Sequence, residues 1–435
     1  MKEAAAELGH LLVFAFLFCL GAFMVVPVIT DVTMAALCPG EDQCSLAIYL
    51  TGLQQAITGL GALVVTPVIG NLSDRYGRKA LLALPATLSV VPLAIMAFNQ
   101  TRPYFYAFYV AKTLTAMVSE GAMMCLSLAY VADKVPEGRR AAAFGVFSGV
   151  CTAGFVGGTI AARFLSVSST FQVATLASVA AAVYLRAFVQ ETDRGASLLR
   201  DEEASRLLFA PSSSPEEASP RLPPLRKAPS LSEMATLLTS SSTFTRAAVV
   251  TFFHSLGETG LQTALLYFLK AQFHYTKNQY ANLLLIIGIT GSFSQLTVMP
   301  LLAPKLGEKK LLVVALTGSC VHGFLYSIAW SFWVPYLAAS CVILSILVSP
   351  CIRSIVSKKV GPSEQGMVQG CITGISSTAS VISPLVFTPL TAWFLSEAAP
   401  FNFKGFSLAC AGFATLVALT MSINMRPAEL QTDTR

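Results

Sequence analysis

Four ionisable residues interrupt segments of the sequence that are otherwise apolar. Lys112 and Glu120 lie in one such segment, and His254 and Glu258 lie in another. An ionisable side chain costs roughly 2.5–3.5 kcal/mol at the centre of a membrane-spanning helix, so a residue retained there is a candidate for function. We expect these four groups to border a substrate path, with one carboxylate, Glu258 or Glu120, exchanging protons. A buried salt bridge or a polar contact between helices is the alternative.

The spacing of these residues defines their places on helices. Lys112 and Glu120 fall on neighbouring faces, about 12 Å apart along the axis at 1.5 Å per residue. His254 and Glu258 are one turn apart on one face, and Glu258 lies at a depth similar to that of Lys112. One histidine and one glutamate do not complete a metal site, so we expect no metal and no cofactor, with a proton gradient as the one energy source under consideration.

A second group of charges occupies a short loop, Gly70-Asn-Leu-Ser-Asp74-Arg75-Tyr-Gly77-Arg78-Lys79. A carboxylate at the end of one helix can meet the N-terminus of another helix and the arginines of its own loop. Gly77 permits the tight turn that such an arrangement needs. A later loop repeats the pairing of acid and base with Asp133 and Arg139.

The elements that carry these charges are predicted to be membrane-spanning helices. Of the 435 residues, 54% are hydrophobic and 12% are charged, about half the charged fraction of a soluble protein. A span needs about 20 apolar residues. Twelve segments qualify, at about 8–30, 45–70, 79–98, 103–131, 141–165, 169–190, 244–269, 278–303, 310–330, 333–356, 365–390 and 404–425.

A polar stretch divides the twelve segments into two sets of six. Residues 191–243 are rich in charge, proline and serine and cannot bury enough apolar surface to fold, so we expect a disordered linker. The predicted domains are therefore an N-terminal six-helix bundle (1–190), the linker (191–243) and a C-terminal six-helix bundle (244–435). Residues 300–309 repeat the glycine and cation of the loop at 70–79 without its aspartate, as expected of diverged halves.

Basic residues outside the linker predict the orientation of the chain. Outside residues 191–243 the chain has 23 bases and 15 acids, and the bases gather in alternate loops around 75–79, 134–140, 305–310 and 358–359. The positive-inside rule places these loops, the linker and both termini in the cytoplasm. The basic surplus therefore needs no nucleic acid to explain it. The choice between the plasma membrane and an endomembrane stays open.

The remaining polar residues have simpler interpretations. Most of the ten cysteines lie singly in apolar stretches as buried thiols. Cys38 and Cys44 follow the first segment, and a disulfide between them is one alternative if that loop faces an oxidising compartment. Arg353, near the cytoplasmic end of the tenth segment, is predicted to be a snorkelling anchor, with a role in gating as the alternative.

The loop at 70–79 resembles the signature of the major facilitator superfamily between its second and third spans, and every constrained position matches. Residues 129–145, with Asp133 and Arg139, resemble the superfamily's loop between spans four and five. The fifth segment resembles an antiporter signature, except that Ala153 and Gly154 replace a glycine and a proline. Close helix packing also explains the glycines of that segment, which are Gly145, Gly149, Gly154, Gly157 and Gly158.

The resemblance implies two six-helix bundles around a central cavity that spans 1, 4, 7 and 10 line. It implies that residues 70–79 latch the bundles together when the protein opens outward, and it places Lys112 where many members carry an arginine linked to proton coupling. The combination is most similar to the tetracycline-resistance-like branch, which includes hippocampus-abundant-transcript-like proteins.

The activity implied by the resemblance is secondary transport of a small organic solute by a monomer in lipid, possible as proton antiport or as facilitated uniport. A receptor or scaffold of the same fold that does not transport is the competing class. An enzyme is not expected, because the sequence has no nucleophile–base pair, metal cluster or phosphate loop.

Overall fold

The structure, a computed structural model, describes residues 2–37, 45–119, 121–191, 241–275, 277–361, 364–395, 399–423 and 425, and throughout these ranges the regular elements are helices. Cys38, Cys44 and Glu120 lie outside the described residues, so the disulfide and the role predicted for Glu120 stay predictions. The linker predicted at 191–243 also lies outside them, except at its two ends.

The first bundle contains six membrane-crossing units, several of them built from two helices in sequence. The order is α1 (Lys2–Met24) with α2 (Val26–Leu37), α3 (Ser45–Tyr76), α4 (Arg78–Leu88) with α5 (Val90–Phe98), α6 (Arg102–Ser119) with α7 (Ala122–Lys134), α8 (Arg140–Phe164) and α9 (Val167–Phe188). A single 3₁₀ turn, η1 (Glu137–Arg139), precedes α8. The break between α6 and α7 occurs at Gly121, whose φ of +88° is accessible chiefly to glycine.

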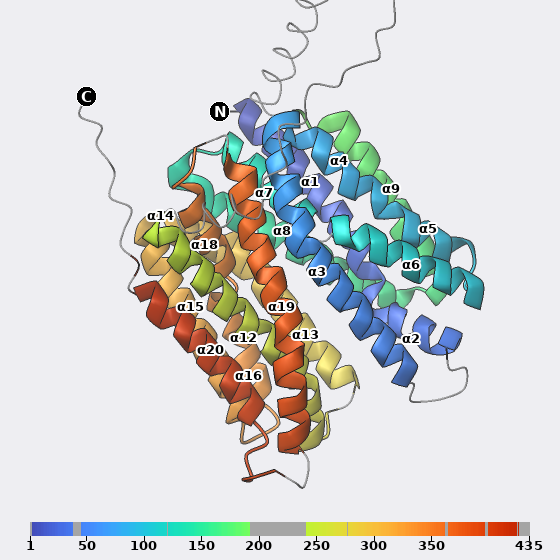
Figure 1. Ribbon diagram of the computed structural model, residues 1–435, viewed down its shortest axis with the longest axis vertical. Coiled ribbons are helices and arrows are strands. Elements are labelled where there is room, and N and C mark those ends of the chain that lie inside the picture. Colours follow the sequence, from blue (N-terminus) through green and yellow to red (C-terminus); the bar gives the residue numbers. More distant parts are fainter. Residues whose placement is uncertain are drawn as a thin grey trace, which may run out of the picture.

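The second bundle repeats this arrangement. Its order is α12 (Ser242–Phe273), α13 (Lys277–Phe293) continued by the π-helical turn η2 (Ser294–Val298) and α14 (Met299–Leu306), α15 (Glu308–Ser327), α16 (Val334–Ser340) with α17 (Val342–Ser345) and α18 (Val348–Ser357), α19 (Gln365–Leu395) and α20 (Phe406–Ile423). Figure 1 shows the two bundles as the blue-to-green and the yellow-to-red halves of the molecule.

Eleven of these units are long and apolar enough to cross a membrane, and α12 is the exception. This helix has 32 residues, ample length for a span, but it carries His254, Glu258 and Gln262 in its middle. These polar side chains lower its mean hydropathy, and two of them, His254 and Glu258, line a cavity described below. The predicted fold is therefore confirmed: twelve transmembrane helices form two six-helix bundles.

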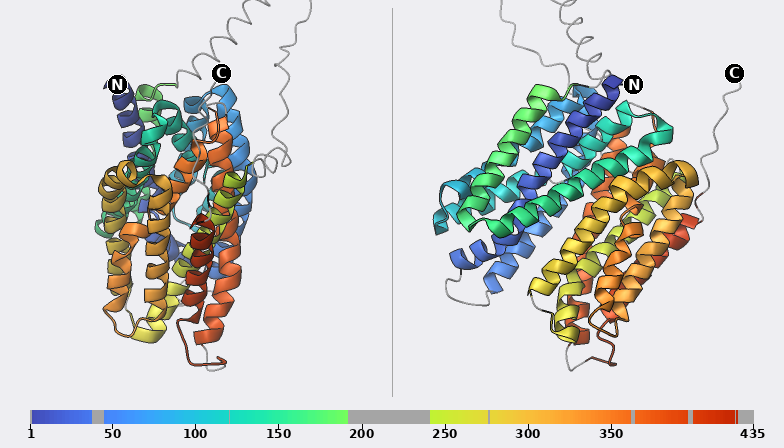
Figure 2. Two further views of the ribbon diagram at one scale, coloured as in Figure 1. Left: turned by 90° about the vertical axis from the view of Figure 1, so that its left-hand side faces the viewer. Right: turned by 180° about the vertical axis from the view of Figure 1, so that it is seen from behind.

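The two bundles meet along two pairs of helices. At the boundary α3 packs against α19, and on the other side α8 packs against α13, η2 and α14. Figure 1 shows the first pair side by side, and the view from behind in Figure 2 shows α8 crossing the second bundle. The loops at 75–79, 134–140, 305–310 and 358–359 lie together at one end of the molecule, which we call the basic end; α1 begins at the same end, where Glu7 pairs with Lys134 at 2.9 Å.

Candidate functional site

The structure contains two polar sites, a charge cluster at the basic end and a cavity in the second bundle. The charge cluster is centred on Asp74, near the end of α3. Its carboxylate accepts hydrogen bonds from the backbone N–H groups of Gly366 and Met367, both at 3.1 Å. These two residues belong to the first turn of α19, whose first N–H groups have no partner within the helix. Asp74 therefore caps a helix of the other bundle.

Arg78 links this carboxylate to a second acid. Its guanidinium pairs with Asp74, and its Nε donates to Oδ2 of Asp133 at 2.9 Å. Its Nη1 also donates to Oγ of Ser73 at 2.5 Å. The side chain is 2% exposed, and a buried cation with two carboxylate partners avoids most of the cost of burying an unpaired charge.

The base near Asp133 that reaches the other bundle is Arg140, which follows the predicted Arg139. Arg139 lies exposed in the turn η1. Arg140 is buried, and its Nη1 donates to the backbone oxygen of Ser357 at 3.1 Å and to Oγ of Ser357 at 3.3 Å. The sequence could not separate these adjacent arginines, because the register of the turn decides which one enters the interface.

Glu191 completes the cluster from the end of α9. Its carboxylate accepts from the backbone N–H groups of Arg78 at 2.7 Å and Lys79 at 3.1 Å, so it caps the start of α4. Gly77 has a φ of +93° and leaves room for that carboxylate. The Nζ of Lys79 donates to the backbone oxygen of Arg186 at 3.0 Å, which ties this residue to its own bundle. The side chain of Arg75 lies outside the described residues.

Sequence analysis assigned Glu191 to the linker, and its place directly after the sixth apolar segment was the signal that could have identified it. No such signal existed for Gly366 and Met367, since backbone N–H groups carry no sequence identity.

Small side chains allow the two bundles to touch at this end. Gly70 and Gly366 approach so closely that a Cβ atom on either would collide with the other's backbone oxygen. Beside them, Sγ of Cys125 lies 3.4 Å from the backbone oxygen of Gly366, and Cys125 is fully buried. Burial of Cys125 therefore depends on contact between the bundles.

The glycines of the fifth segment serve two packing surfaces of α8. Gly145 and Gly149 face Gln295, Leu296 and Met299 of the second bundle. Gly154, Gly157 and Gly158 face α1 within the first bundle, where a Cβ atom on Gly158 would lie 2.7 Å from the backbone oxygen of Leu20. The row thus lets α8 approach both a neighbour in its own bundle and a partner in the other.

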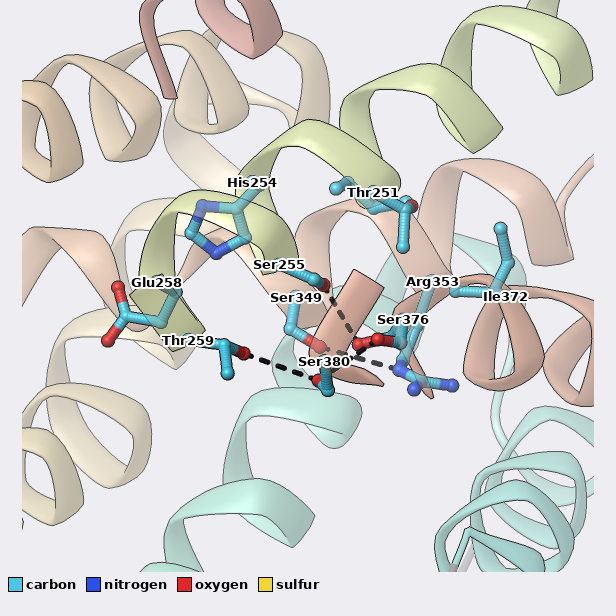
Figure 3. Close-up of a pocket in the computed structure, with 11 residues that line it drawn as sticks. Thr251, His254, Ser255, Glu258, Thr259, Ser349, Arg353, Ile372, Ser376 and Ser380 are labelled. Atoms are coloured by element: carbon cyan, nitrogen blue, oxygen red, sulfur yellow. Dashed lines mark hydrogen bonds between the residues drawn. The ribbon is translucent and has the colours of Figure 1, made fainter. Parts of the chain in front are cut away.

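The second site is a partly open cavity of about 160 Å³ lined by α12, α18 and α19. Its polar lining includes His254, Ser255, Glu258, Arg353, Ser376 and Ser380. Figure 3 shows hydroxyl pairs joining α12 to α19, with Ser255 2.8 Å from Ser376 and Thr259 3.3 Å from Ser380. Such hydroxyls both donate and accept hydrogen bonds, so they suit a polar solute.

Two of the four predicted intramembrane charges meet in this cavity. Glu258 accepts a hydrogen bond from Nε2 of Gln262 at 3.3 Å, and Nδ1 of His254 is buried without a hydrogen-bond partner among the described residues. Lys112 lies elsewhere, in the first bundle, with its Nζ 5.6 Å from the centre of the Phe108 ring. The cavity is thus lined by the second bundle alone, and the structure does not bring Lys112 to its lining.

Arg353 corrects the snorkelling prediction. Its side chain does not extend along the surface toward the bundle end but is buried, with 8% of the residue exposed, and it lines the cavity. Its Nη1 donates to Oε1 of Gln369 and to Oγ1 of Thr373, both at 3.2 Å. The polar partners on α19 turn the guanidinium inward, and a sequence without tertiary contacts does not reveal them.

Comparison with known proteins identifies the family of the chain. A family model described as Major Facilitator Superfamily matches residues 11–384 and 247–432. The chain belongs to the major facilitator superfamily. Superfamily membership indicates a multi-pass membrane protein.

Within the superfamily, the chain is similar to curated proteins of two kinds. It is 24% identical over 344 residues to the human Hippocampus abundant transcript 1 protein, covering 78% of this chain and 65% of that protein. It is 24% identical over 342 residues to the class E tetracycline resistance protein of Escherichia coli, covering 77% of each. The chain thus spans slightly less than two thirds of the first relative.

Two solved structures share the superfamily fold. One is described as the human organic anion transporter MFSD10 (TETRAN), with a TM-score of 0.74, 18% identity, and coverage of 96% of this chain and 99% of that one. Another is the proton:xylose symporter XylE, with a TM-score of 0.69, 14% identity, and coverage of 97% and 96%.

Proposed function

We propose that this protein moves a small organic solute across a membrane by alternating access, coupled to protons, with its basic end in the cytoplasm. The observation that carries the proposal is the cap that Asp74 places on α19. This contact joins the two bundles through a few buried polar groups at the basic end, so it can form and break as a unit when the bundles rock. The positive-inside rule supports a cytoplasmic position for that end.

In this proposal the described conformation is closed toward the cytoplasm. Arg78 and Asp133 hold Asp74 in place within the first bundle, and Arg140 adds a second contact between bundles at Ser357. The opposite conformation requires Asp74 to leave α19, after which Asp74 retains Arg78 as its partner. Opening therefore breaks two hydrogen bonds but leaves no charge unpaired.

Glu258 is the proposed proton site. It is the one carboxylate among the described residues that line the cavity, and His254 one turn away offers a second group that can take a proton. Of the relatives, XylE is described as a proton symporter, and MFSD10 as an organic anion transporter. These descriptions support a small organic solute and coupling to protons, and they leave the direction of coupling to experiment.

The test is flux into liposomes that contain the purified protein, with and without a pH gradient, over a panel of drugs, sugars and organic anions. We expect a pH gradient to stimulate flux of at least one solute. Glu258→Gln should abolish that stimulation while exchange of the solute without a gradient continues. Glu7→Gln, which removes a carboxylate outside the cavity, is the matched control and should keep the stimulation.

Other outcomes favour the other functions. Flux through the wild-type protein that is equal with and without the pH gradient would identify a uniporter. A folded protein that carries no solute of the panel would favour a receptor or scaffold.

A further inference from the structure

We propose that the solute is an organic anion and that Arg353 binds its anionic group. This inference rests on the proposed function to the extent that it treats the cavity as the solute site. It starts from the electrostatics of one side chain. Arg353 lies at the cavity wall on α18, with 8% of the residue exposed, and arginine keeps its charge under all physiological conditions.

The partners of Arg353 in the described part of the chain are all neutral. They are the hydroxyl of Ser349 at 3.4 Å, the amide oxygen of Gln369 at 3.2 Å and the hydroxyl of Thr373 at 3.2 Å. By contrast, Arg78 has two carboxylates as partners, and Arg140, which is as buried as Arg353, has the carboxylate of Glu137 at 3.9 Å. An enclosed charge without a counter-charge costs several kcal/mol. Arg353 is therefore a buried cation whose charge an anionic ligand would neutralise.

Glu258 does not supply that counter-charge. In Figure 3 the carboxylate of Glu258 and the guanidinium of Arg353 lie apart on the lining, and no ion pair joins them among the described residues. The hydrogen bonds of Glu258 run to Gln262 on its own helix instead. The cavity thus has a cationic part and a protonatable part, which an organic anion and a proton can occupy together.

The donors of Arg353 leave capacity for a ligand. A guanidinium has five N–H donors. The hydrogen bonds described for Arg353 use one N–H of Nη2, which donates to Thr373, so the second N–H of Nη2 has no partner among the described residues. The bond from Nε to Ser349 is long at 3.4 Å and is readily exchanged. Planar anions such as carboxylates bind arginine through two such parallel bonds.

The volume of the cavity indicates the size of the group that it can hold next to Arg353. Its volume is about 160 Å³, and an engineered cavity of about 150 Å³ in another protein admits benzene. Ile352 and Ile372 supply apolar lining beside the hydroxyls of Ser255 and Ser376. A carboxylate attached to a single ring therefore matches the cavity in charge, size and polarity.

The first experiment compares carboxylates with their uncharged amides on the purified protein. The probes are benzoate against benzamide and nicotinate against nicotinamide, and the readout is the melting temperature at rising ligand concentration. We expect at least one carboxylate to raise the melting temperature with an apparent affinity tenfold or more above that of its amide. The proposal is overturned if neither carboxylate exceeds its amide.

Variants then assign the preference to Arg353. Arg353→Gln should remove the preference for the carboxylate. Arg353→Lys should keep part of it, because lysine retains the charge but lacks the two parallel N–H donors of a guanidinium. Arg163→Gln, which neutralises an exposed arginine of α8, is the matched control and should keep the full preference. A preference that survives in both Arg353 variants would place the anion elsewhere and overturn the assignment.

A second measurement needs no variant, in case Arg353→Gln fails to fold. Phenylglyoxal modifies arginine side chains that it can reach. Mass spectrometry would measure how much of Arg353 is modified in the wild-type protein. Benzoate should protect Arg353 and benzamide should not, whereas equal modification with both ligands contradicts the proposal.

Binding and flux separate this inference from the proposed function. Carboxylate binding without flux of any solute would support the anion site and refute transport. Proton-stimulated flux of neutral solutes, without carboxylate binding, would support transport and refute the anion site.

Discussion

Replacing Asp74 by asparagine should release the contact between the bundles at the basic end. Asparagine keeps the shape of the side chain and one oxygen, but it removes the charge that faces the N–H groups of Gly366 and Met367. A hydrogen bond to a charged group contributes about 1.5–3 kcal/mol, whereas a neutral one contributes about 0.5–1.5 kcal/mol. The two N–H groups bind different oxygens of Asp74, and asparagine keeps one bond in neutral form but loses the other, because its amide NH2 cannot accept. The closed arrangement is therefore destabilised by about 2.5–4.5 kcal/mol.

This free energy translates into a population change. Because about 1.4 kcal/mol corresponds to a factor of ten, the ratio of open to closed molecules should rise about 60- to 1,600-fold. The change acts on the conformational equilibrium rather than on folding, because both hydrogen bonds run between the bundles. Arg78 keeps Asp133 as a partner in the variant, so no buried cation is stranded.

Cys125 provides the assay. Its thiol lies against Gly366 and is fully buried while the bundles touch, so a water-soluble maleimide reaches it only after they separate. In a background whose other cysteines are replaced by serine, the labelling rate of Cys125 should rise by at least tenfold in Asp74→Asn. Glu7→Gln, which breaks an ion pair at the same end but within the first bundle, should leave the rate unchanged.

A second reporter separates opening from unfolding. Cys351 is fully buried in a hydrophobic cluster made mostly of second-bundle residues, and none of the contacts described for Asp74 or Gly366 involves it, so retained alone it should stay unlabelled in Asp74→Asn. Fast labelling of both cysteines would indicate loss of folding instead. An unchanged rate at Cys125, in a variant that melts as the wild type does, would refute the reasoning about the latch.

Two further predictions follow from the same contacts. Arg140→Gln loses the charge that donates to Ser357 across the interface, so the labelling rate of Cys125 should rise about tenfold, equivalent to about 1.4 kcal/mol; no rise would show that Arg140 carries none of the contact. Gly158→Val forces side-chain atoms into the backbone of α1, so calorimetry should show a lower melting temperature and a free energy of unfolding reduced by about 1–3 kcal/mol. Gly138→Val is the control and should melt as the wild type does, because a Cβ atom at Gly138 has no neighbour within 4 Å. Equal melting temperatures of the two variants would contradict the packing described for Gly158.

Much of the architecture could be predicted from the sequence because lipid imposes a strong local rule. Each span must satisfy its own backbone hydrogen bonds, so apolar stretches of sufficient length predict helices one by one. The acid of the loop at 70–79 was also predictable as a partner for arginines and for a helix N-terminus. The helix that Asp74 caps could not be predicted, since the N–H group of Gly366 lies 292 residues away in the chain and almost any residue type can supply such a group.

Some side chains required the three-dimensional packing. Lys112 and Glu258 were predicted at similar depths, yet depth alone does not define which face of a helix meets the cavity, and Lys112 lies outside the described lining. Arg353 near a helix end satisfied the pattern of a snorkelling residue. Its direction depends on Gln369 and Thr373, which belong to the next helix.

The sequence by itself determined the number of spans, the division into two bundles, the superfamily resemblance and the loop that carries Asp74. These features follow from composition and from neighbours in the chain, where the interaction partners are known in advance. The tertiary structure alone decided that Asp74 caps α19, that Arg140 rather than Arg139 is buried at the interface, and that Arg353 lines a cavity without a described counter-charge. The physical reason is that burial and charge pairing depend on helix rotation and on partners from distant segments, which local sequence does not specify.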